Sequence, residues 1–166
     1  VERLGDTTGA ITGDNGVTGS PTGARVERIA TDLTMPLSVT AVIPHNNSTP
    51  SPVDGASVLS ATLATKPGEG LLIEAVLPYV ELSGSTGPVT AHLFADGVAI
   101  ASTTERITTG GSSGSPIRLV ARLVAIGTTL AIDLRLGPST AGPTITVGSK
   151  FNGGSDPHLI LHRDPA

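Results

Sequence analysis

The chain has 166 residues and a formal net charge of −4 at pH 7, and only 14% of its residues are charged, against about a quarter in an average globular domain. An acidic chain with 2% aromatic residues has neither the basic surface nor the stacking side chains of nucleic-acid-binding proteins. It has no cysteine, which excludes disulfides and thiolate metal sites, and no apolar run approaches the ~18 residues of a membrane-spanning helix. Few charges and a mean hydropathy of +0.20 favour self-assembly; a Thr/Ser-rich surface on a monomer is the alternative. We expect no cofactor.

Residues 1–34 differ in composition from the rest of the chain. They are rich in Gly and Thr, and Ile-Thr-Gly at 11–13 is followed by Val-Thr-Gly at 17–19. Such a segment cannot bury enough apolar surface to offset its own ordering entropy. We therefore expect an extended arm that neighbouring subunits or a larger surface hold in place. Its expected contact residues are Ile11, Thr12, Val17, Thr18 and Arg25.

Residues 35–166 are expected to form one all-β domain. Alternating apolar residues and turn signals predict strands at 37–43, 58–65, 71–82, 89–95, 98–103, 119–124, 130–136, 144–147 and 158–161. Pro78 within one of these strands implies a sheet edge or a bulge. No segment has a helical period. The pattern predicts a jelly-roll β-sandwich of about eight antiparallel strands.

Two hairpins are predicted within this domain. Asp96-Gly97 is a strong type I′ turn signal, and it would place Leu93 opposite Ile100 and Ala95 opposite Val98. The second hairpin covers 119–136, with a two-residue turn at Gly127-Thr128. Its register would place Leu123 opposite Ile132 and would pair Arg122 with Asp133 across the other face, as an ion pair.

Candidate catalytic and metal-binding residues each have a simpler structural explanation. Glu74 and Glu81 are an odd number of positions apart in one strand, so they should point to opposite faces and should not form the carboxylate pair of a glycosidase. His158 and His162 share a strand face and are expected to be solvent or interface residues, although three copies around a threefold axis would offer a metal site. Asp14-Asn15-Gly16 lacks the further ligands of a calcium loop and is expected to be a plain turn.

The outward strand faces supply the candidate oligomer contacts. Glu74 is expected either on a solvated face or in a subunit interface, with Arg118, Arg122 or Arg135 as its partner. His92 and Phe94 should face outward from the first hairpin, either as interface anchors or as a second apolar layer of the sandwich. The expected interface residues are Glu74, His92, Phe94, Arg122 and Asp133.

The order of strand and turn motifs over residues 40–163 resembles one family. The motifs are Ile43-Pro44, Val58-Leu59-Ser60, Lys66-Pro67, Leu71 to Ala75, Ala91 to Gly97, Arg118 to Arg122, Gly127-Thr128-Thr129 and Phe151 to Gly154. Together they resemble the trimeric jelly-roll domain of bacteriophage tail-fibre and virion-surface proteins, whose fold belongs to the complement-component and tumour-necrosis-factor-like group. The chain departs from tail fibres in lacking a recognisable shaft or attachment domain.

The resemblance implies a non-enzymatic structural protein of the virion surface, assembled in the cytoplasm of a bacterial host. A short arm and a compact head favour a capsid decoration protein, a homotrimer whose partner is the major capsid protein or another virion protein. The alternative is the receptor-binding tip of a tail fibre, which binds a host surface receptor through loops 46–54, 108–115 and 148–156. Its expected contacts are Asn46, Asn47, Ser112, Ser113 and Asn152.

Overall fold

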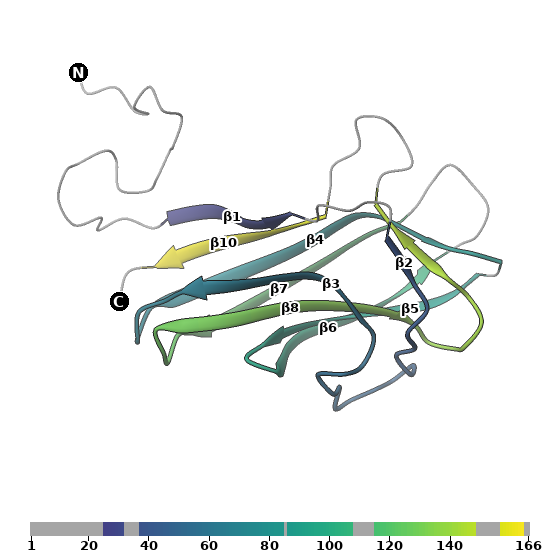
Figure 1. Cartoon of the computed structure of the whole chain (residues 1–166), viewed down its shortest axis with the longest axis horizontal. Coiled ribbons are helices and arrows are strands. Elements are labelled where there is room, and N and C mark those ends of the chain that lie inside the picture. The colour runs from purple at the N-terminus through teal and green to yellow at the C-terminus, as the bar shows by residue number, and fades with distance from the viewer. Residues whose placement is uncertain (1–24, 32–36, 85, 108–114, 149–156, 165–166) are drawn as a thin grey trace, which may run out of the picture.

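The protein is a β-sandwich in which two antiparallel sheets face each other (Figure 1). The computed structural model describes residues 25–31, 37–84, 86–107, 115–148 and 157–164, the first of these ranges by its backbone alone. These residues contain no helix, and so none long and apolar enough to cross a membrane. The strands are β1 (Arg25–Thr31), β2 (Leu37–Val39), β3 (Ala56–Ala64), β4 (Gly70–Leu82), β5 (Gly87–Ala95), β6 (Val98–Ile107), β7 (Ser115–Val124), β8 (Thr129–Pro138), β9 (Ile145–Val147) and β10 (His158–Asp164).

The ten strands occupy eight strand positions, four in each sheet. In the first sheet β4 pairs with β7 on one side, and on its other side with β10 at residues 70–76 and with β9 at residues 80–82. β1 flanks β10 and β2 flanks β9, so each of the two positions beyond β4 on this side is filled by two short strands in succession. The second sheet has the order β3-β8-β5-β6. This arrangement confirms the predicted all-β jelly-roll sandwich.

The core lies between the sheets and is made of the alternate residues of each strand. Leu71, Ile73 and Ala75 of β4 face Leu93 of β5 and Leu134 of β8 across the sandwich, and all five are buried. The strict alternation that predicted the strands is therefore the pattern of inward side chains.

The predicted hairpin over 119–136 is wrong, although both of its strands exist. β7 pairs with β4 in the first sheet, whereas β8 pairs with β3 and β5 in the second. The connection at 125–128 crosses from one sheet to the other, and Gly127 is not among the residues with positive φ that a two-residue turn would need. Both arrangements bury the same alternate residues, so periodicity could not distinguish them.

The hairpin at Asp96-Gly97 is confirmed. Asp96 (φ 48°) and Gly97 (φ 78°) both have the positive φ of a type I′ turn, and β5 pairs with β6. Ala95 lies opposite Val98 as predicted. A register shift after Leu93 places that residue opposite Ala101, one position beyond the expected Ile100.

A bulge in β4 changes which residues face outward. The register with β7 shifts between Leu77 and Val80, around Pro78, which confirms the predicted bulge. Leu77 and Val80 are both buried, so inward-facing residues continue on each side of the bulge. The half-buried side chains that alternate with these inward residues therefore all lie on the outer face of the sheet. Glu74 and Glu81 therefore point to the same face, contrary to the prediction, but they lie seven positions apart along the strand.

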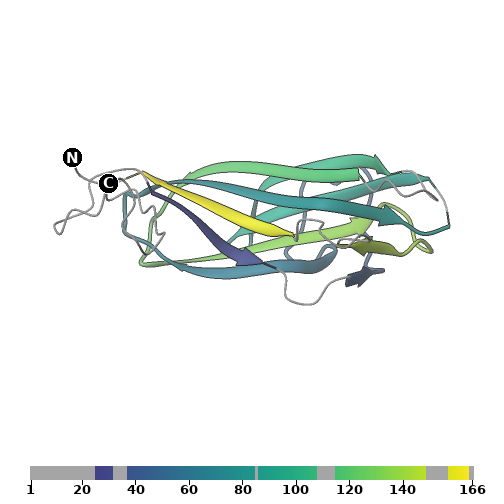
Figure 2. The same ribbon diagram turned by 90° about the horizontal axis from the view of Figure 1, so that it is seen from above.

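The chain enters the sandwich earlier than predicted. β1 falls within the expected arm of residues 1–34, and its first residue, Arg25, lies opposite Arg163 of β10. In Figure 2 β1 and β10 run beside each other along the molecule. Ile11, Thr12, Val17 and Thr18, and the Asp14-Asn15-Gly16 turn, lie outside the described residues.

Candidate functional site

At one end of the sandwich, two connections are held together by backbone hydrogen bonds. The turn between β3 and β4 meets the β7–β8 connection, where Thr65 N donates to Thr128 O (2.9 Å) and Ala125 N donates to Glu69 O (2.9 Å). The Glu69 side chain, almost fully buried, accepts two hydrogen bonds from Nη1 of Arg163 at 2.9 and 3.0 Å. This end is therefore a rigid platform.

Exposed aliphatic side chains gather on this platform. Ile126 is 90% exposed, Val98 is 65% exposed and Val124 is 61% exposed. We call these three residues the end patch. Burying an aliphatic side chain of this size is worth about 1.5–3 kcal/mol relative to leaving it in water. A cluster of three on a rigid platform is therefore a candidate contact surface.

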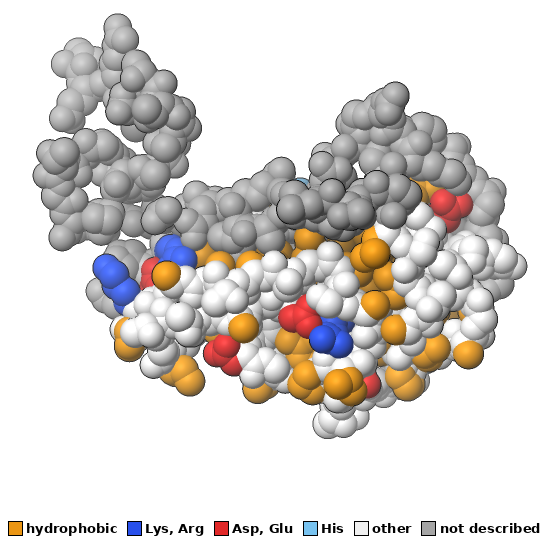
Figure 3. All heavy atoms as spheres, viewed as in Figure 1, with side chains coloured by type: hydrophobic (Ala, Val, Ile, Leu, Met, Phe, Trp, Pro, Cys, Tyr) orange, Lys and Arg blue, Asp and Glu red, His pale blue; other side chains and the backbone are white. Residues whose placement is uncertain are grey.

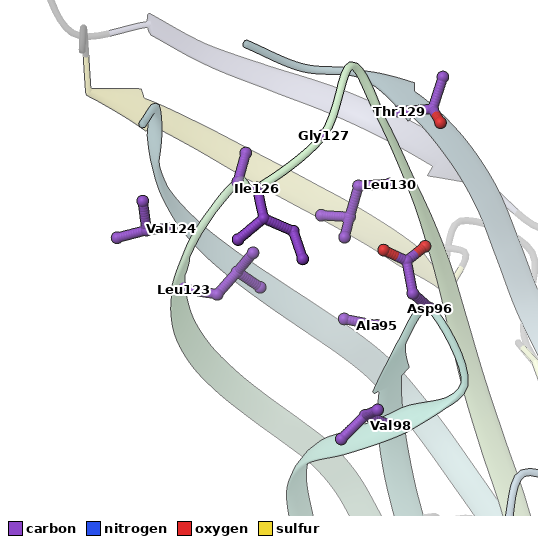
Figure 4. Close-up of a pocket in the computed structure, with 10 residues that line it drawn as sticks. Ala95, Asp96, Val98, Leu123, Val124, Ile126, Gly127, Thr129 and Leu130 are labelled. Carbon is purple, nitrogen blue, oxygen red and sulfur yellow. The ribbon is translucent and has the colours of Figure 1, made fainter. Parts of the chain in front are cut away.

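A cavity of about 200 Å³ lies beside the end patch, between the β5–β6 hairpin and the β7–β8 connection. Figure 4 shows Ile126, Leu123 and Val124 on one side of it and Ala95, Asp96 and Val98 on the other. Among the described residues that line it, Asp96 alone is charged, and its Oδ1 already accepts a hydrogen bond from Ala131 N at 2.8 Å. The cavity is smaller than the ~300–1,000 Å³ of typical small-molecule sites. It suits an aliphatic side chain.

The outer face of the first sheet carries a charged cluster. Glu74 accepts a hydrogen bond from Nη2 of Arg118 at 2.5 Å and pairs with Nε2 of His162 at 3.1 Å. The hydrogen bond from Arg118 is the main cause that lowers the pKa of Glu74, and burial opposes it. Of the three candidate partners, Arg118 is therefore the one that Glu74 contacts, and the contact lies within one chain.

The outer face of the second sheet is covered by the loop of residues 40–55, which we call the covering loop. Ile43 N donates to Pro138 O (2.9 Å), and the side chain of Ile43 is fully buried against the backbone of β8. Beneath this loop His92 and Phe94 are each 1% exposed, with their rings 6.0 Å apart. They form a second apolar layer of the sandwich, so the prediction of interface anchors is wrong.

His92 is buried without the hydrogen bonds that its ring can make. Neither ring nitrogen has a partner within the part of the chain that the structure describes. Burial lowers the pKa of His92, and the nearby charge of Asp54 partly opposes this. The ring is therefore held in its neutral form.

Asp133 and Arg122 do not form the predicted ion pair, because β7 and β8 belong to different sheets. Asp133 accepts a hydrogen bond from Nε of Arg135 at 2.6 Å and another from the Ser57 hydroxyl at 2.5 Å. Arg122 lies opposite Leu72 on the exposed face of β7. Figure 3 shows how few charged side chains lie on one side of the molecule, among uncharged and hydrophobic ones.

The predicted binding loops are described only in part. Asn46 is exposed and has a positive φ of 64°, and Nδ2 of Asn47 donates to Oδ2 of Asp54 at 2.6 Å. Asp54 Oδ2 also accepts a hydrogen bond from Ser51 N at 2.6 Å, so one carboxylate organises the tip of the covering loop. Ser112, Ser113 and Asn152 lie outside the described residues.

The two histidines of β10 lie in different surroundings. His158 is buried, and His162 contacts Glu74. Among the described residues, no three His, Asp or Glu side chains cluster so as to hold a metal ion.

The end patch is the feature that the sequence analysis missed. Its signal was the sequence Val124-Ala125-Ile126-Gly127, where an isoleucine stands at the point at which the strand pattern ends. An isoleucine in a connection rarely serves the turn itself. Assigning Gly127-Thr128 to a two-residue hairpin turn hid this meaning.

Comparison with families of proteins and with the sequences of curated proteins finds no match. Among solved structures, the chain is similar to the C-terminal domain of EclA, a sugar-binding protein, with 14% identity over 89% of this chain and 90% of that one and a TM-score of 0.40. It is also similar to the CBM22-1 xylan-binding domain of Paenibacillus barcinonensis Xyn10C, with 15% identity over 86% of each chain and a TM-score of 0.37.

A third similar structure is a protein of infectious bursal disease virus, Gx strain, with 14% identity over 85% of this chain and 37% of that one and a TM-score of 0.36. Two of these three structures are described as binding domains and the third is viral.

Proposed function

We propose that the chain is a non-enzymatic structural protein of a phage virion, which decorates the capsid surface as a homotrimer. The observation that carries the proposal is the end patch, three exposed aliphatic residues on a rigid platform. Covering such a surface with a neighbouring chain lowers the free energy, because apolar side chains are removed from water. The assignment to a virion rests on the resemblance of residues 40–163 to phage virion-surface domains.

The polar chemistry of the described residues supports a structural role. The Glu74 carboxylate is engaged by Arg118 and His162, and Glu69 by Arg163. A glycosidase needs two facing carboxylates, and the bulge in β4 leaves Glu74 and Glu81 on one face but far apart along the strand. These carboxylates therefore serve the fold.

The test is binding of the purified full-length protein to undecorated capsids of the phage that encodes it, with its mass measured in solution. We expect a trimer, saturable binding, and a loss of occupancy on deletion of residues 1–24, a deletion that keeps β1 in the sheet. Ile126→Ser should also lower occupancy, whereas Ala141→Ser, at an exposed loop position near the opposite end, should not. If the deletion of residues 1–24 and Ile126→Ser both left the occupancy unchanged, the proposal would be overturned.

A receptor-binding tip is the second candidate, and the covering loop favours it. Asp54 fixes the loop tip, while Asn46 and Thr49 remain exposed. A preorganised polar loop on a rigid sheet suits recognition. However, Phe94 is buried, so its ring is not available for stacking on a sugar. Binding to host cells that survives deletion of residues 1–24, without affinity for capsids, would establish this function instead.

A further inference from the structure

The end patch lies at the same end of the sandwich as the start of the first strand. Arg25 of β1 lies opposite Arg163 of β10, Arg163 lies opposite Leu71 of β4, and Leu71 lies opposite Leu123 of β7. These four residues form one row across the sheet, and neighbouring strands are about 4.8 Å apart. The point where residues 1–24 join the sandwich is thus about 15 Å from the residues that border the end patch.

The chain before Arg25 is long enough to reach such a patch on its own or on an adjacent molecule. An extended chain spans about 3.3 Å per residue. Val17 is eight residues before Arg25 and Ile11 is fourteen residues before it. They can therefore reach about 26 and 46 Å from the start of β1.

The chemistry of the cavity selects an aliphatic occupant. Its wall consists mainly of Ala95, Leu123, Leu130 and the end patch, and the carboxylate of Asp96 is already hydrogen-bonded. The Ile-Thr-Gly and Val-Thr-Gly segments at 11–13 and 17–19 each present one β-branched aliphatic side chain, Ile11 and Val17, between small and polar residues. Each segment therefore offers a single apolar side chain that fits one small cavity.

We infer that the end patch is the docking site for the N-terminal segment of a second copy of this chain, with Val17 or Ile11 in the cavity beside Ile126. The choice of a second copy over the same chain rests on the proposed function, in which copies are linked on a surface. Each molecule then both gives a segment and receives one, and three such contacts in a trimer reinforce one another, because later contacts are intramolecular.

The absence of native cysteine allows a direct test. Full-length Val17→Cys and full-length Ile126→Cys are co-expressed, so that one trimer can contain both, and are then oxidised. The disulfide-linked dimer between the two variants is quantified by mass spectrometry. The matched control replaces Ile126→Cys with Ala141→Cys, which is exposed near the opposite end of the sandwich. Ile11→Cys is run in parallel with both. Because Ile126 is 90% exposed, its substitution leaves the core intact.

We expect at least tenfold more heterodimer with the Ile126→Cys acceptor than with the Ala141→Cys acceptor, for one of the two donor positions. Equal yields would overturn the inference. So would a Val17→Cys/Ile126→Cys double variant that forms its disulfide only within a single chain, since the segment would then fold back on its own molecule.

Capsid binding by the unmodified protein, measured on the same preparation, separates this inference from the proposed function. Capsid binding without the 17–126 or 11–126 cross-link refutes the docking site and leaves the decoration role standing. The cross-link without capsid binding supports the docking site and refutes decoration.

Discussion

The side chain of Ile43 lies directly on Gly137, where there is no room for a methyl group. A Cβ atom at Gly137 would stand 2.8 Å from Cγ1 of Ile43 and 3.0 Å from its backbone nitrogen. Because Ile43 N donates to Pro138 O, the loop cannot move away without losing a hydrogen bond. The absence of a side chain at Gly137 is what lets the covering loop lie on the second sheet.

Replacing Gly137 with alanine should therefore destabilise the protein. We expect a loss of about 1–3 kcal/mol in the free energy of unfolding, the usual cost of overpacking. Gly127→Ala is the matched control, since a Cβ there would meet its nearest atom at an ordinary 3.6 Å. Denaturant unfolding of the two variants measures the difference, and equal stabilities would show that the loop yields freely.

The stability of the protein should fall on mild acidification because of His92. Its pKa is lowered in the folded state, so the unfolded chain, with a histidine pKa of about 6.5, binds the proton more readily. The contribution of neutral His92 is fully present above pH ~6.5 and is lost as the pH falls below that value.

His92→Leu tests this directly. The variant removes a ring whose nitrogens have no partner among the described residues, so we expect little loss at pH 7.5 and a flatter profile of stability between pH 6.5 and 5. His45→Leu, in the exposed part of the covering loop, should keep the steep profile. Identical profiles for both variants would exclude His92 as the cause.

Arg118 and Arg122 offer a matched pair for measuring the Glu74 cluster. Both lie on the outer face of β7, but only Arg118 is bonded to Glu74, and it is itself 62% exposed. Arg118→Gln should cost about 0.5–1 kcal/mol at pH 7, and Arg122→Gln should cost less. Because the pKa of Glu74 is lowered in the folded protein, this contribution is present above the unfolded value of about 4.5 and disappears as the pH falls further. A double-mutant cycle with Glu74→Gln, repeated at pH 3, measures it.

The tip of the covering loop should depend on one carboxylate. Asp54→Ala removes the acceptor of two 2.6 Å hydrogen bonds, from Asn47 and from the backbone of Ser51. We expect faster amide hydrogen exchange over residues 44–55 and a loss of about 1–3 kcal/mol. Val53→Ala, at a 78% exposed position in the same loop, is the control and should leave exchange unchanged.

The two glycine turns explain how far the sequence could predict this fold. Asp96-Gly97 specifies its turn locally, since both residues adopt the positive φ that the turn requires. The hairpin predicted from these two residues is therefore confirmed. Gly127-Thr128 carries no such requirement. Whether its flanking strands pair depends on hydrogen bonds to β4 and β3, whose paired residues are at least 35 positions away in sequence. Strand existence is thus a local property here, and strand pairing is not.

The candidate site was less predictable, for similar reasons. Pro78 predicted a sheet edge or a bulge, and the structure has a bulge. The face to which Glu81 points depends on how many residues the bulge inserts, which the sequence does not give. Phe94 alternates as an outward residue should, and it is buried because the covering loop, which comes earlier in the chain, lies over this face. The isoleucine in the connection at 125–128 was visible in the sequence, but its clustering with Val98 follows only from the way the chain crosses between the sheets.

The adjacency of β1 and β10 has a mechanical consequence. These strands are antiparallel neighbours, and Arg25 and Arg163 stand opposite each other at one end of the ladder. Tension applied to the segments that flank this pair would load the inter-strand hydrogen bonds one after another, as in opening a zipper, and not all at once as in shear. A molecule pulled at both ends should therefore release β1 at low force, while the sandwich behind it stays closed.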